Sequence, residues 1–390
     1  MNAFSIAIVG AGPAGYFAAQ ALQNLQTDNL KFKIDMIEKL PTPWGLVRSG
    51  VAPDHPKIKT VSKVFEKIAT TEGFQLFCNV ELGKDITIDE LTSNYDAVVI
   101  ATGSDRGRRL GIPGENLRGS LSSAEFVPWY NAHPDYVDVD VPLDTDTAVV
   151  IGAGNVAMDV ARMLALEPSE LDTSDTSLHA LELLHSSSIR KVHVFARRGP
   201  EHAAFTSPEL RELPKLEHTD AVIGSCDIED AIKRAESLGE VPKDVRSNLD
   251  AMLSIANTPS QNRDRSINFH FFASPIEIKG DQRVEEVIFA VNKVENGKVV
   301  QTSDTYSVKT GLIISAIGYE PEPISGIPYE NGKVVNQEGR ISDSNMYVVG
   351  WAKRGPSGVI GTNKSDSAAV IEHLISDLKT PKPNSGIGKL

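Results

Sequence analysis

The feature that most constrains this chain is an apolar stretch that runs directly into closely spaced glycines, from Ser5 to Gly15. Its residues up to position 9 are all small or β-branched, which is typical of a short strand buried in a parallel sheet. Gly10, Gly12 and Gly15 then follow in G-x-G-x-x-G spacing. The first glycine allows a tight turn, the second leaves room for a pyrophosphate against the backbone, and the third lets helix and strand pack closely. The stretch therefore predicts a strand–turn–helix unit whose helix N-terminus faces phosphate groups.

An acidic residue follows the next strand at the distance that a ribose site requires. That strand is expected at residues 33–37 and ends in Glu38, about 20 residues after the glycines. A carboxylate in this place accepts hydrogen bonds from ribose hydroxyls. A glycine turn in an ordinary βαβ unit would leave Glu38 unexplained, so strand, helix, strand and acid together predict dinucleotide binding.

A second fingerprint stands in the middle of the chain. Residues 147–151 are predicted to form a strand that leads into Gly152-Ala-Gly154-Asn-Val-Ala157, a G-x-G-x-x-A turn, and then into a helix from Val156 to Leu166. Two such units of different detail predict two dinucleotides, or two halves of a site where the units meet.

The second unit carries a basic pair where the first unit carries its acid. Arg197 and Arg198 directly follow a strand expected at residues 191–196. A carboxylate here would repel a ribose 2′-phosphate, whereas guanidinium groups bind one through charge-assisted hydrogen bonds. Each such bond contributes about 1.5–3 kcal/mol. The alternative is a solvated basic turn, but the position after a fingerprint favours a site for the phosphorylated nicotinamide dinucleotide.

A proline-rich loop, residues 39–57, follows the first βαβ unit. It contains four prolines and two glycines, which exclude regular structure, yet it is rich in large apolar groups. We expect a stiff loop packed against a flat surface, here the ring system of the dinucleotide. A surface loop with an incidental Trp44 is the alternative. Beyond the loop, the helical spacing of apolar residues predicts one helix over residues 58–69.

Two apolar strands that break into small residues mark the ends of the dinucleotide units. Residues 97–103 close the first unit, and residues 310–318 repeat that ending and close the second. The expected fold is α/β, with two Rossmann-like three-layer dinucleotide-binding domains. Between the closing strands we expect an acidic loop at 128–146, loop and charged helix at 199–255, and antiparallel strands at 267–272, 284–291 and 305–308.

Composition excludes several classes of function. The net charge of −13 disfavours binding to bulk nucleic acid. No run approaches the roughly 18 apolar residues of a membrane span. The two cysteines, Cys78 and Cys226, lie far apart, which fits a reducing compartment and excludes a Cys-x-x-Cys redox pair and a protein-ligated iron–sulfur cluster. The first strand starts within five residues of the N-terminus, so we expect that a targeting peptide is lacking or was removed.

Several longer motifs belong together. They are the glycine turn at 10–15, the stretch from Gly45 to Pro56, residues 154–162, Arg197-Arg-Gly-Pro200 with Ala204-Phe-Thr206, and Trp351 to Thr362. Together they resemble the adrenodoxin-reductase type of ferredoxin–NADP⁺ reductase over about residues 5–372. The resemblance implies a discontinuous FAD-binding domain, residues 1–105 and 320–390, into which an NADP-binding domain, residues 106–319, is inserted.

Carried over residue by residue, the resemblance implies two cofactor sites and no metal ligands. The flavin site would comprise Gly10, Gly12, Ala14, Gly15, Glu38, Leu46, Trp351, Gly358, Val359 and Ile360. The NADP site would comprise Arg108, Gly152, Gly154, Asn155, Val156, Arg197, Arg198 and Glu209. The resemblance also places His55 near the flavin with Asp159 as its partner, and Glu212 near the nicotinamide. His55 and Asp159 would relay a proton or position a reacting group, with a structural hydrogen bond as the alternative.

The activity that the resemblance implies is electron transfer between NADPH and an iron–sulfur ferredoxin. FAD would take a hydride from NADPH, and the ferredoxin would receive one electron at a time. A monomer is expected, located in the cytoplasm, or in the mitochondrial matrix if a presequence was removed. The alternatives are an NADPH-dependent flavin monooxygenase, a flavoprotein electron-input subunit of a larger complex, and a flavin disulfide reductase. The low cysteine count argues against the last two.

One region departs from the family pattern. The helix that faces the ferredoxin is strongly basic in vertebrate members of the family. The corresponding region here mixes Lys233 and Arg234 with Glu229, Asp230 and Glu236. The identity of the acceptor and the charge of its surface are therefore left open.

Overall fold

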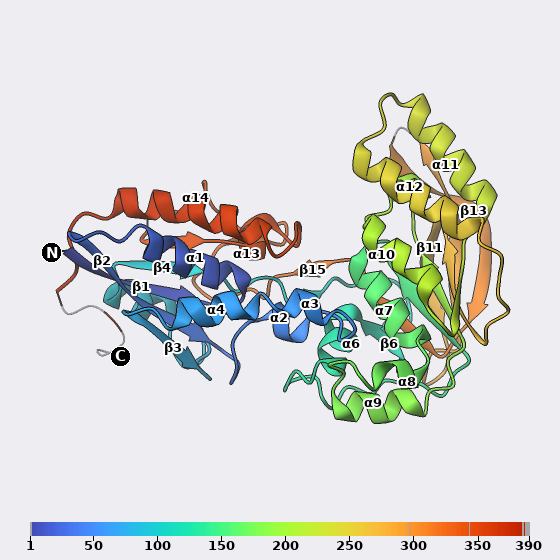
Figure 1. Cartoon of the computed structure of the whole chain (residues 1–390), viewed down its shortest axis with the longest axis horizontal. Coiled ribbons are helices and arrows are strands. Elements are labelled where there is room, and N and C mark those ends of the chain that lie inside the picture. Colours follow the sequence, from blue (N-terminus) through green and yellow to red (C-terminus); the bar gives the residue numbers. More distant parts are fainter. Residues whose placement is uncertain (1, 296, 343, 384–385, 387–390) are drawn as a thin grey trace. The chain divides into compact units, whose positions relative to one another are not determined.

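The chain forms two compact units in the computed structural model, which describes residues 2–295, 297–342, 344–383 and 386 (Figure 1). The first unit comprises Met1–Val51, His55–Arg106 and Gly318–Leu390, and the second comprises Ala52–Asp54 and Gly107–Ile317. The short strands β5 (Arg106–Gly107) and β15 (Tyr319–Glu320) lie where the chain leaves and re-enters the first unit.

The first unit is built on a six-stranded sheet in the order β18-β19-β4-β1-β2-β3. Neighbouring strands are parallel except for the edge pair β18–β19, which is antiparallel. The strands are β1 (Asn2–Val9), β2 (Leu30–Glu38), β3 (Phe74–Cys78), β4 (Ala97–Ile100), β18 (Arg340–Ile341) and β19 (Met346–Val348). The strand β1 is apolar on both faces because both faces of the sheet are covered.

Helices on both sides complete three layers in this unit. Alternate residues of β1 point to opposite faces, so Ile6 and Ile8 join the core beneath α1 (Pro13–Asn24), α4 (Ser62–Ala69) and α14 (Thr362–Asp377). Ala7 and Val9 join the second core, beneath α5 (Ile88–Asn94). The short elements are α2 (Leu46–Ser49), α3 (Pro56–Lys59), α13 (Trp351–Arg354), β16 (Tyr329–Glu330) and β17 (Lys333–Val334).

The second unit has its own six-stranded sheet in the order β6-β14-β7-β8-β10-β9, and all neighbours are parallel. The strands are β6 (Ser120–Ser122), β7 (Thr147–Ile151), β8 (Lys191–Phe195), β9 (Thr219–Val222), β10 (Arg265–His270) and β14 (Leu312–Ser315). The prediction of an α/β fold with two parallel sheets is confirmed.

Helices cover one face of this sheet and an antiparallel sheet covers the other. The helical side consists of α6 (Ser123–Tyr130), α7 (Asn155–Ala165), α8 (Pro168–Leu171), α9 (Leu178–His185), α10 (Ser207–Glu212), α11 (Ser225–Ser237) and α12 (Lys243–Ala256). The opposite layer is the meander β11 (Ala273–Lys279), β12 (Glu286–Glu295) and β13 (Lys298–Lys309). The antiparallel additions predicted after residue 267 are confirmed in β11–β13, whereas β10 itself belongs to the parallel sheet.

Four local predictions were wrong. The loop at 39–57, expected to lack regular structure, contains the one-turn helix α2 and the start of α3. The helix expected over 58–69 is divided into α3 and α4, because the Thr60 hydroxyl donates to the Lys57 carbonyl (2.7 Å) and competes with the helical bond. The loop expected at 128–146 begins later, because a capping box at Ser122 starts α6 and the buried Trp129 and Tyr130 outweigh the cost of a proline in the helix. Strand β9 was missed because it is short and polar.

None of the described helices is long and apolar enough to span a membrane. Cys78 is a free, half-buried thiol, and the side chain of Cys226 lies outside the described part of the chain.

Candidate functional site

The glycine turn of the first unit is shaped by close backbone contacts. Gly10 has a φ of +108°, and a Cβ there would lie 2.5 Å from the carbonyl oxygen of Ala101. A Cβ on Gly15 would lie 2.1 Å from the carbonyl oxygen of Gly10. The Cβ position of Gly12, by contrast, has only the Gly45 Cα nearby, at 4.0 Å. The outer glycines are therefore required by the fold, whereas the middle one leaves room for a ligand.

Glu38 lies at the carboxyl end of β2, beside this turn, and is only 7% exposed. Its carboxylate oxygens accept hydrogen bonds from the backbone N–H groups of Ala11 (2.9 Å) and Leu40 (3.0 Å). These bonds fix the carboxylate, and each oxygen keeps a second lone pair for another donor. The geometry is compatible with the predicted bond to ribose hydroxyls.

Two buried hydroxyl groups follow β4 close to the same turn. Thr102 Oγ1 and Ser104 Oγ have no hydrogen-bond partner among the described residues. They follow Ala101, whose carbonyl packs against Gly10. Because buried polar atoms are rarely left unpaired, these hydroxyls fit a polar ligand over the glycine turn.

The proline-rich loop is tied to the glycine turn. The N–H of Trp44 donates to the carbonyl of Ala11 (2.8 Å), and a Cβ on Gly45 would lie 3.0 Å from the Cα of Gly12. Trp44 has a φ of +93°, a conformation that costs a non-glycine residue free energy and is concentrated at functional sites. The Arg48 guanidinium lies 4.3 Å from the centre of the Trp44 ring. The predicted flavin residue Leu46 directly follows Gly45 as the first residue of α2.

The C-terminal part of the chain reaches the same turn through Gly350. This residue has a φ of +70°, and a Cβ there would lie 2.5 Å from the Cβ of Ala14 on α1. Asp366 of α14 accepts from the Gly350 N–H (2.7 Å) and from the side chains of Lys353 (3.0 Å) and Arg354 (3.1 Å). The predicted flavin residue Ala14 is therefore in contact with the C-terminal segment, which carries the predicted flavin residues between Trp351 and Ile360.

Those remaining residues lie between α13 and the start of α14. Trp351 Nε1 donates to the carbonyl of Ser357 (3.1 Å), and Gly358 adopts a φ of +82°. Val359 is 70% exposed, while Ile360 packs against the core of the first unit. The segment offers an apolar side chain and bare backbone at one place, which suits contact with a flat ring system.

The glycine turn of the second unit repeats this division of roles. Gly152 has a φ of +150°, and a Cβ there would lie 2.3 Å from the carbonyl oxygen of Ala316. A Cβ on Gly154 would meet no atom within 4 Å. Asn155, which begins α7 and precedes the predicted Val156, accepts from the Thr206 N–H (2.8 Å). The open side of the turn is therefore at Gly154, as expected for a pyrophosphate site.

The arginine pair follows β8, as predicted. Arg197 is exposed, and Arg198 is half-buried with an Nε that has no hydrogen-bond partner among the described residues. Their backbone is fixed because Asn292 Nδ2 donates to the Arg197 carbonyl (2.8 Å) and the Phe272 N–H donates to the Arg198 carbonyl (3.2 Å). A buried guanidinium nitrogen without an acceptor suits an anionic ligand. Arg108, also predicted to bind NADP, is exposed.

The second unit also contains a buried arginine surrounded by carboxylates. Arg162 on α7 is 1% exposed and donates to both oxygens of Asp54 (2.7 and 3.0 Å), to Asp159 (2.9 Å) and to Glu209 (3.0 Å). Burial lowers the pKa of this guanidinium, but the hydrogen bond and charge of Asp54 and the charges of Asp159 and Glu209 outweigh burial and raise it. Arg162 thus joins two predicted site residues to the segment Ala52–Asp54.

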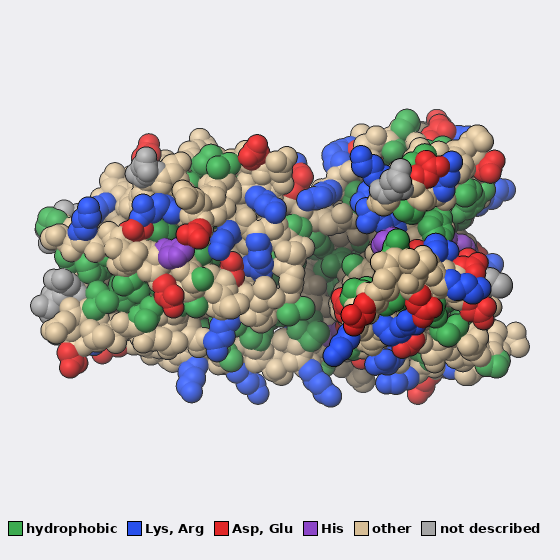
Figure 2. All heavy atoms as spheres, turned by 90° about the horizontal axis from the view of Figure 1, so that it is seen from above, with side chains coloured by type: hydrophobic (Ala, Val, Ile, Leu, Met, Phe, Trp, Pro, Cys, Tyr) green, Lys and Arg blue, Asp and Glu red, His purple; other side chains and the backbone are tan. Residues whose placement is uncertain are grey.

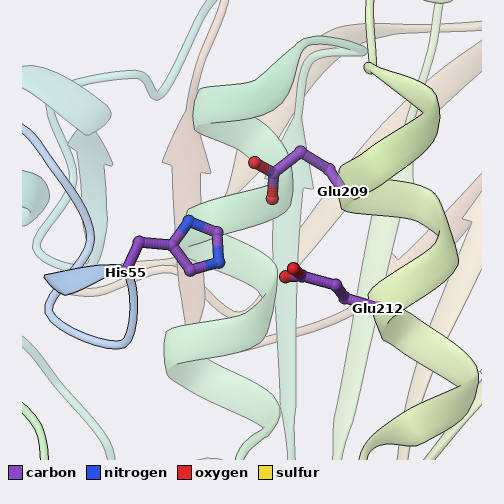
Figure 3. Close-up of side chains that lie close together, drawn as sticks. All are labelled: His55, Glu209 and Glu212. Atoms are coloured by element: carbon purple, nitrogen blue, oxygen red, sulfur yellow. The ribbon is translucent and has the colours of Figure 1, made fainter. Parts of the chain in front are cut away.

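Figure 3 shows Glu209 and Glu212 on α10 and His55 in the loop before α3. The two carboxylates are one turn apart on the helix, so they project from the same side. His55 is the residue after Asp54, whose carboxylate is bound by Arg162.

Comparisons with known proteins agree on one family. The model of the pyridine nucleotide-disulphide oxidoreductases matches residues 4–197. The NADPH-ferredoxin reductase FprA of Mycobacterium tuberculosis is 44% identical, with 98% of this chain and 86% of the relative covered. The mitochondrial NADPH:adrenodoxin oxidoreductase of Salvelinus fontinalis is 37% identical, with 96% of this chain and 78% of the relative covered. The chain belongs to the NADPH–ferredoxin reductase family.

Solved structures agree with this assignment. Mycobacterium tuberculosis FprA in complex with NADPH superimposes with a TM-score of 0.92 at 44% identity, covering 96% of this chain and 84% of that one. A thioredoxin reductase of Lactococcus lactis shares the fold at a TM-score of 0.51 and 19% identity. The predicted family, the two-domain α/β fold and the class of oxidoreductase are confirmed. The individual site residues stay predictions.

Sequence reasoning did not single out Arg162 as a site residue of this reductase. A signal was present, since the arginine stands among the apolar residues of a predicted helix, Val160, Ala161, Met163 and Leu164. A charged side chain in such a place is almost always paired. Its partners could not be named, because Asp54 is 108 residues away in the chain.

Proposed function

We propose that this protein is a flavoprotein reductase that passes electrons from NADPH to an iron–sulfur ferredoxin. One NADPH would give up a hydride and reduce two ferredoxins, with release of NADP⁺ and one proton. The observation that carries the proposal is the opposite chemistry of the two glycine turns. Glu38 lies beside the first turn and Arg197 and Arg198 follow the strand beside the second. An acid suits a free ribose and an arginine pair suits a ribose phosphate.

We assign FAD to the first unit. Gly12 leaves the open side for the pyrophosphate, Glu38 accepts from the ribose, and Thr102 and Ser104 supply unpaired hydroxyls. The loop at Trp44 and the segment at Val359 would cover the ring system and exclude water from it. Bound FAD would supply the conversion of a two-electron hydride into single electrons.

We assign NADPH to the second unit. Gly154 is the open point of the turn, and Arg197 and Arg198 are placed to bind the 2′-phosphate. His55, Asp159 and Glu212 are proposed to orient the nicotinamide and to exchange a proton with water. For Asp159 this role depends on Arg162, whose guanidinium orients its carboxylate.

The test of this function starts with the purified protein. We expect the absorption bands of bound flavin, and their bleaching by NADPH with a KM far below that for NADH. The double variant Arg197→Gln, Arg198→Gln should raise the KM for NADPH about a hundredfold, from two lost charge-assisted bonds, and leave that for NADH nearly unchanged. Lys191→Gln, an exposed cation on β8, is the matched control and should change neither. A colourless protein that refuses added FAD would contradict the proposal.

We also propose the class of partner, the location and the oligomeric state of this protein. The named relatives are ferredoxin or adrenodoxin reductases, which supports an iron–sulfur acceptor. Two relatives at 44% identity are bacterial, which supports a cytoplasmic location. We propose a monomer, which light scattering of the purified chain would test.

A further inference from the structure

The charge of this chain is divided unequally between its two units. The first unit contains 18 of the 39 Lys and Arg residues and 19 of the 52 Asp and Glu residues, a net charge of −1. The second unit contains the remaining 21 and 33, a net charge of −12. An acidic partner is therefore repelled by the second unit as a whole and not by the first. In Figure 2, Lys and Arg side chains project along one edge of the first unit.

Two short helices of the first unit combine positive charge with exposed apolar surface. Lys57 and Ile58 lie on α3, and Lys63, Val64 and Lys67 lie on α4. All five are exposed, with Ile58 at 44% and Val64 at 40%. We call this set the α3–α4 face.

The cations of the α3–α4 face are available to a partner. None of Lys57, Lys63 and Lys67 forms an ion pair among the residues that the structure describes. Lys63 and Lys67 are four residues apart and so lie on one side of α4, with Glu66 as the one exposed acid of that helix. Elsewhere in the first unit, Lys39, Lys353 and Arg354 are neutralised by Asp105 or Asp366.

The α3–α4 face directly continues the loop that approaches the glycine turn. Trp44 ties this loop to Ala11, and α3 begins at Pro56, at the loop's end. A protein seated on the face would therefore lie against the unit to which the flavin is assigned. Single electrons need a short path from donor to acceptor, and the α3 end of the face is the end that follows this loop.

We propose that the α3–α4 face is the docking surface for the one-electron acceptor, an iron–sulfur protein of net negative charge. The proposal rests on the proposed function, which supplies the acceptor class. Exposed lysines together with exposed aliphatic side chains on the same two helices suit an interface that combines apolar contact with charge. Complementary charge raises the association rate, and salt screens it.

The experiment compares two double charge reversals at exposed lysines of the first unit. The test variant is Lys63→Glu, Lys67→Glu. The control is Lys33→Glu, Lys379→Glu, which changes the same charge at exposed residues. Lys379 lies near the amino end of β4, since Lys382 donates to Asp96 there. Each variant is assayed with NADPH, a purified ferredoxin of net negative charge, and cytochrome c as final acceptor, from low to high ionic strength.

We expect the test variant to lose about tenfold in kcat/KM for ferredoxin at low salt and to approach the wild type as salt rises. The control should lose less than twofold. Val64→Ser should lose several-fold at every salt concentration, because its contribution is apolar.

Reduction of menadione, a small neutral acceptor, separates this proposal from the proposed function. It should be unchanged in all variants, and its absence from the wild type would contradict the reductase assignment itself. Equal losses in test and control would overturn the α3–α4 face, as would a faster rate in the test variant. If kcat/KM for ferredoxin fell instead in the variant Lys233→Glu on α11, the docking surface would lie on the second unit, and the α3–α4 face would again be overturned.

Discussion

Replacing Arg162 by methionine removes a buried guanidinium that binds three carboxylates of the second unit. The guanidinium makes four hydrogen bonds of 2.7–3.0 Å and is itself 1% exposed. Breaking a buried ion pair from one side costs about 3–5 kcal/mol. The side chains of Asp54, Asp159 and Glu209 are 15–21% exposed and can regain some water, so we expect the lower end, about 3 kcal/mol.

The assay is urea unfolding followed by circular dichroism, with the free energy of unfolding taken from the transition of the second unit. Arg211→Met is the matched control, since it makes the same change at an exposed arginine of α10, and it should cost less than about 0.5 kcal/mol. Arg162→Lys keeps the charge but cannot bind Asp54 with two parallel bonds, so it should fall between the two. A loss below about 1 kcal/mol for Arg162→Met would refute the view that this cluster stabilises the unit.

The remaining predictions concern single positions of the second unit. Gly154→Ala should leave the free energy of unfolding within about 0.5 kcal/mol of the wild type, because its Cβ meets nothing within 4 Å, yet raise the KM for NADPH. Gly152→Ala, with a φ of +150° and a Cβ only 2.3 Å from the Ala316 carbonyl oxygen, should lower stability by about 2 kcal/mol; equal stability of the two variants would contradict the assigned roles. Burial, and then the neighbouring His193, lower the pKa of His270 to about 4. As the pH falls, the unfolded chain therefore binds a proton at this histidine before the folded chain does. A contribution of about 3 kcal/mol to the free energy of unfolding is present above pH 6.5 and is lost as the pH falls toward 4. His270→Phe, which preserves the stack on Phe195, should flatten the urea-derived stability profile in that window, and an unchanged slope would rule this out.

The two nucleotide-binding units follow from local physical rules that act over short stretches of the sequence. A tight turn between a buried strand and a helix needs glycine at Gly10 and Gly152, whatever the rest of the chain does. The acid at Glu38 and the arginines at 197 and 198 stand at constant distances from these turns, so two nucleotide units of opposite preference could be predicted. The acid and the arginine pair each lie within about 50 residues of their glycine turn. Over such a short separation, the strand–turn–helix–strand connection itself determines where these residues lie.

The elements that were predicted wrongly depend on packing. Helix α6 extends into the expected loop at 128–146 because Trp129 and Tyr130 are buried, and that burial comes from residues distant in the chain. Strand β9 exists because β10 offers it a parallel partner. The local pattern of apolar residues therefore predicts neither the extent of α6 nor the presence of β9.

The tertiary structure alone decided which charges meet. Asp54 reaches Arg162 across 108 residues, and only the fold shows that Asp159 and Glu209 share that guanidinium. The division of net charge between the units likewise requires knowing that residues 318–390 return to the first unit. Spacing in the sequence specifies how a turn is built, but long-range electrostatics depends on distances through space, and these exist only once the chain has folded.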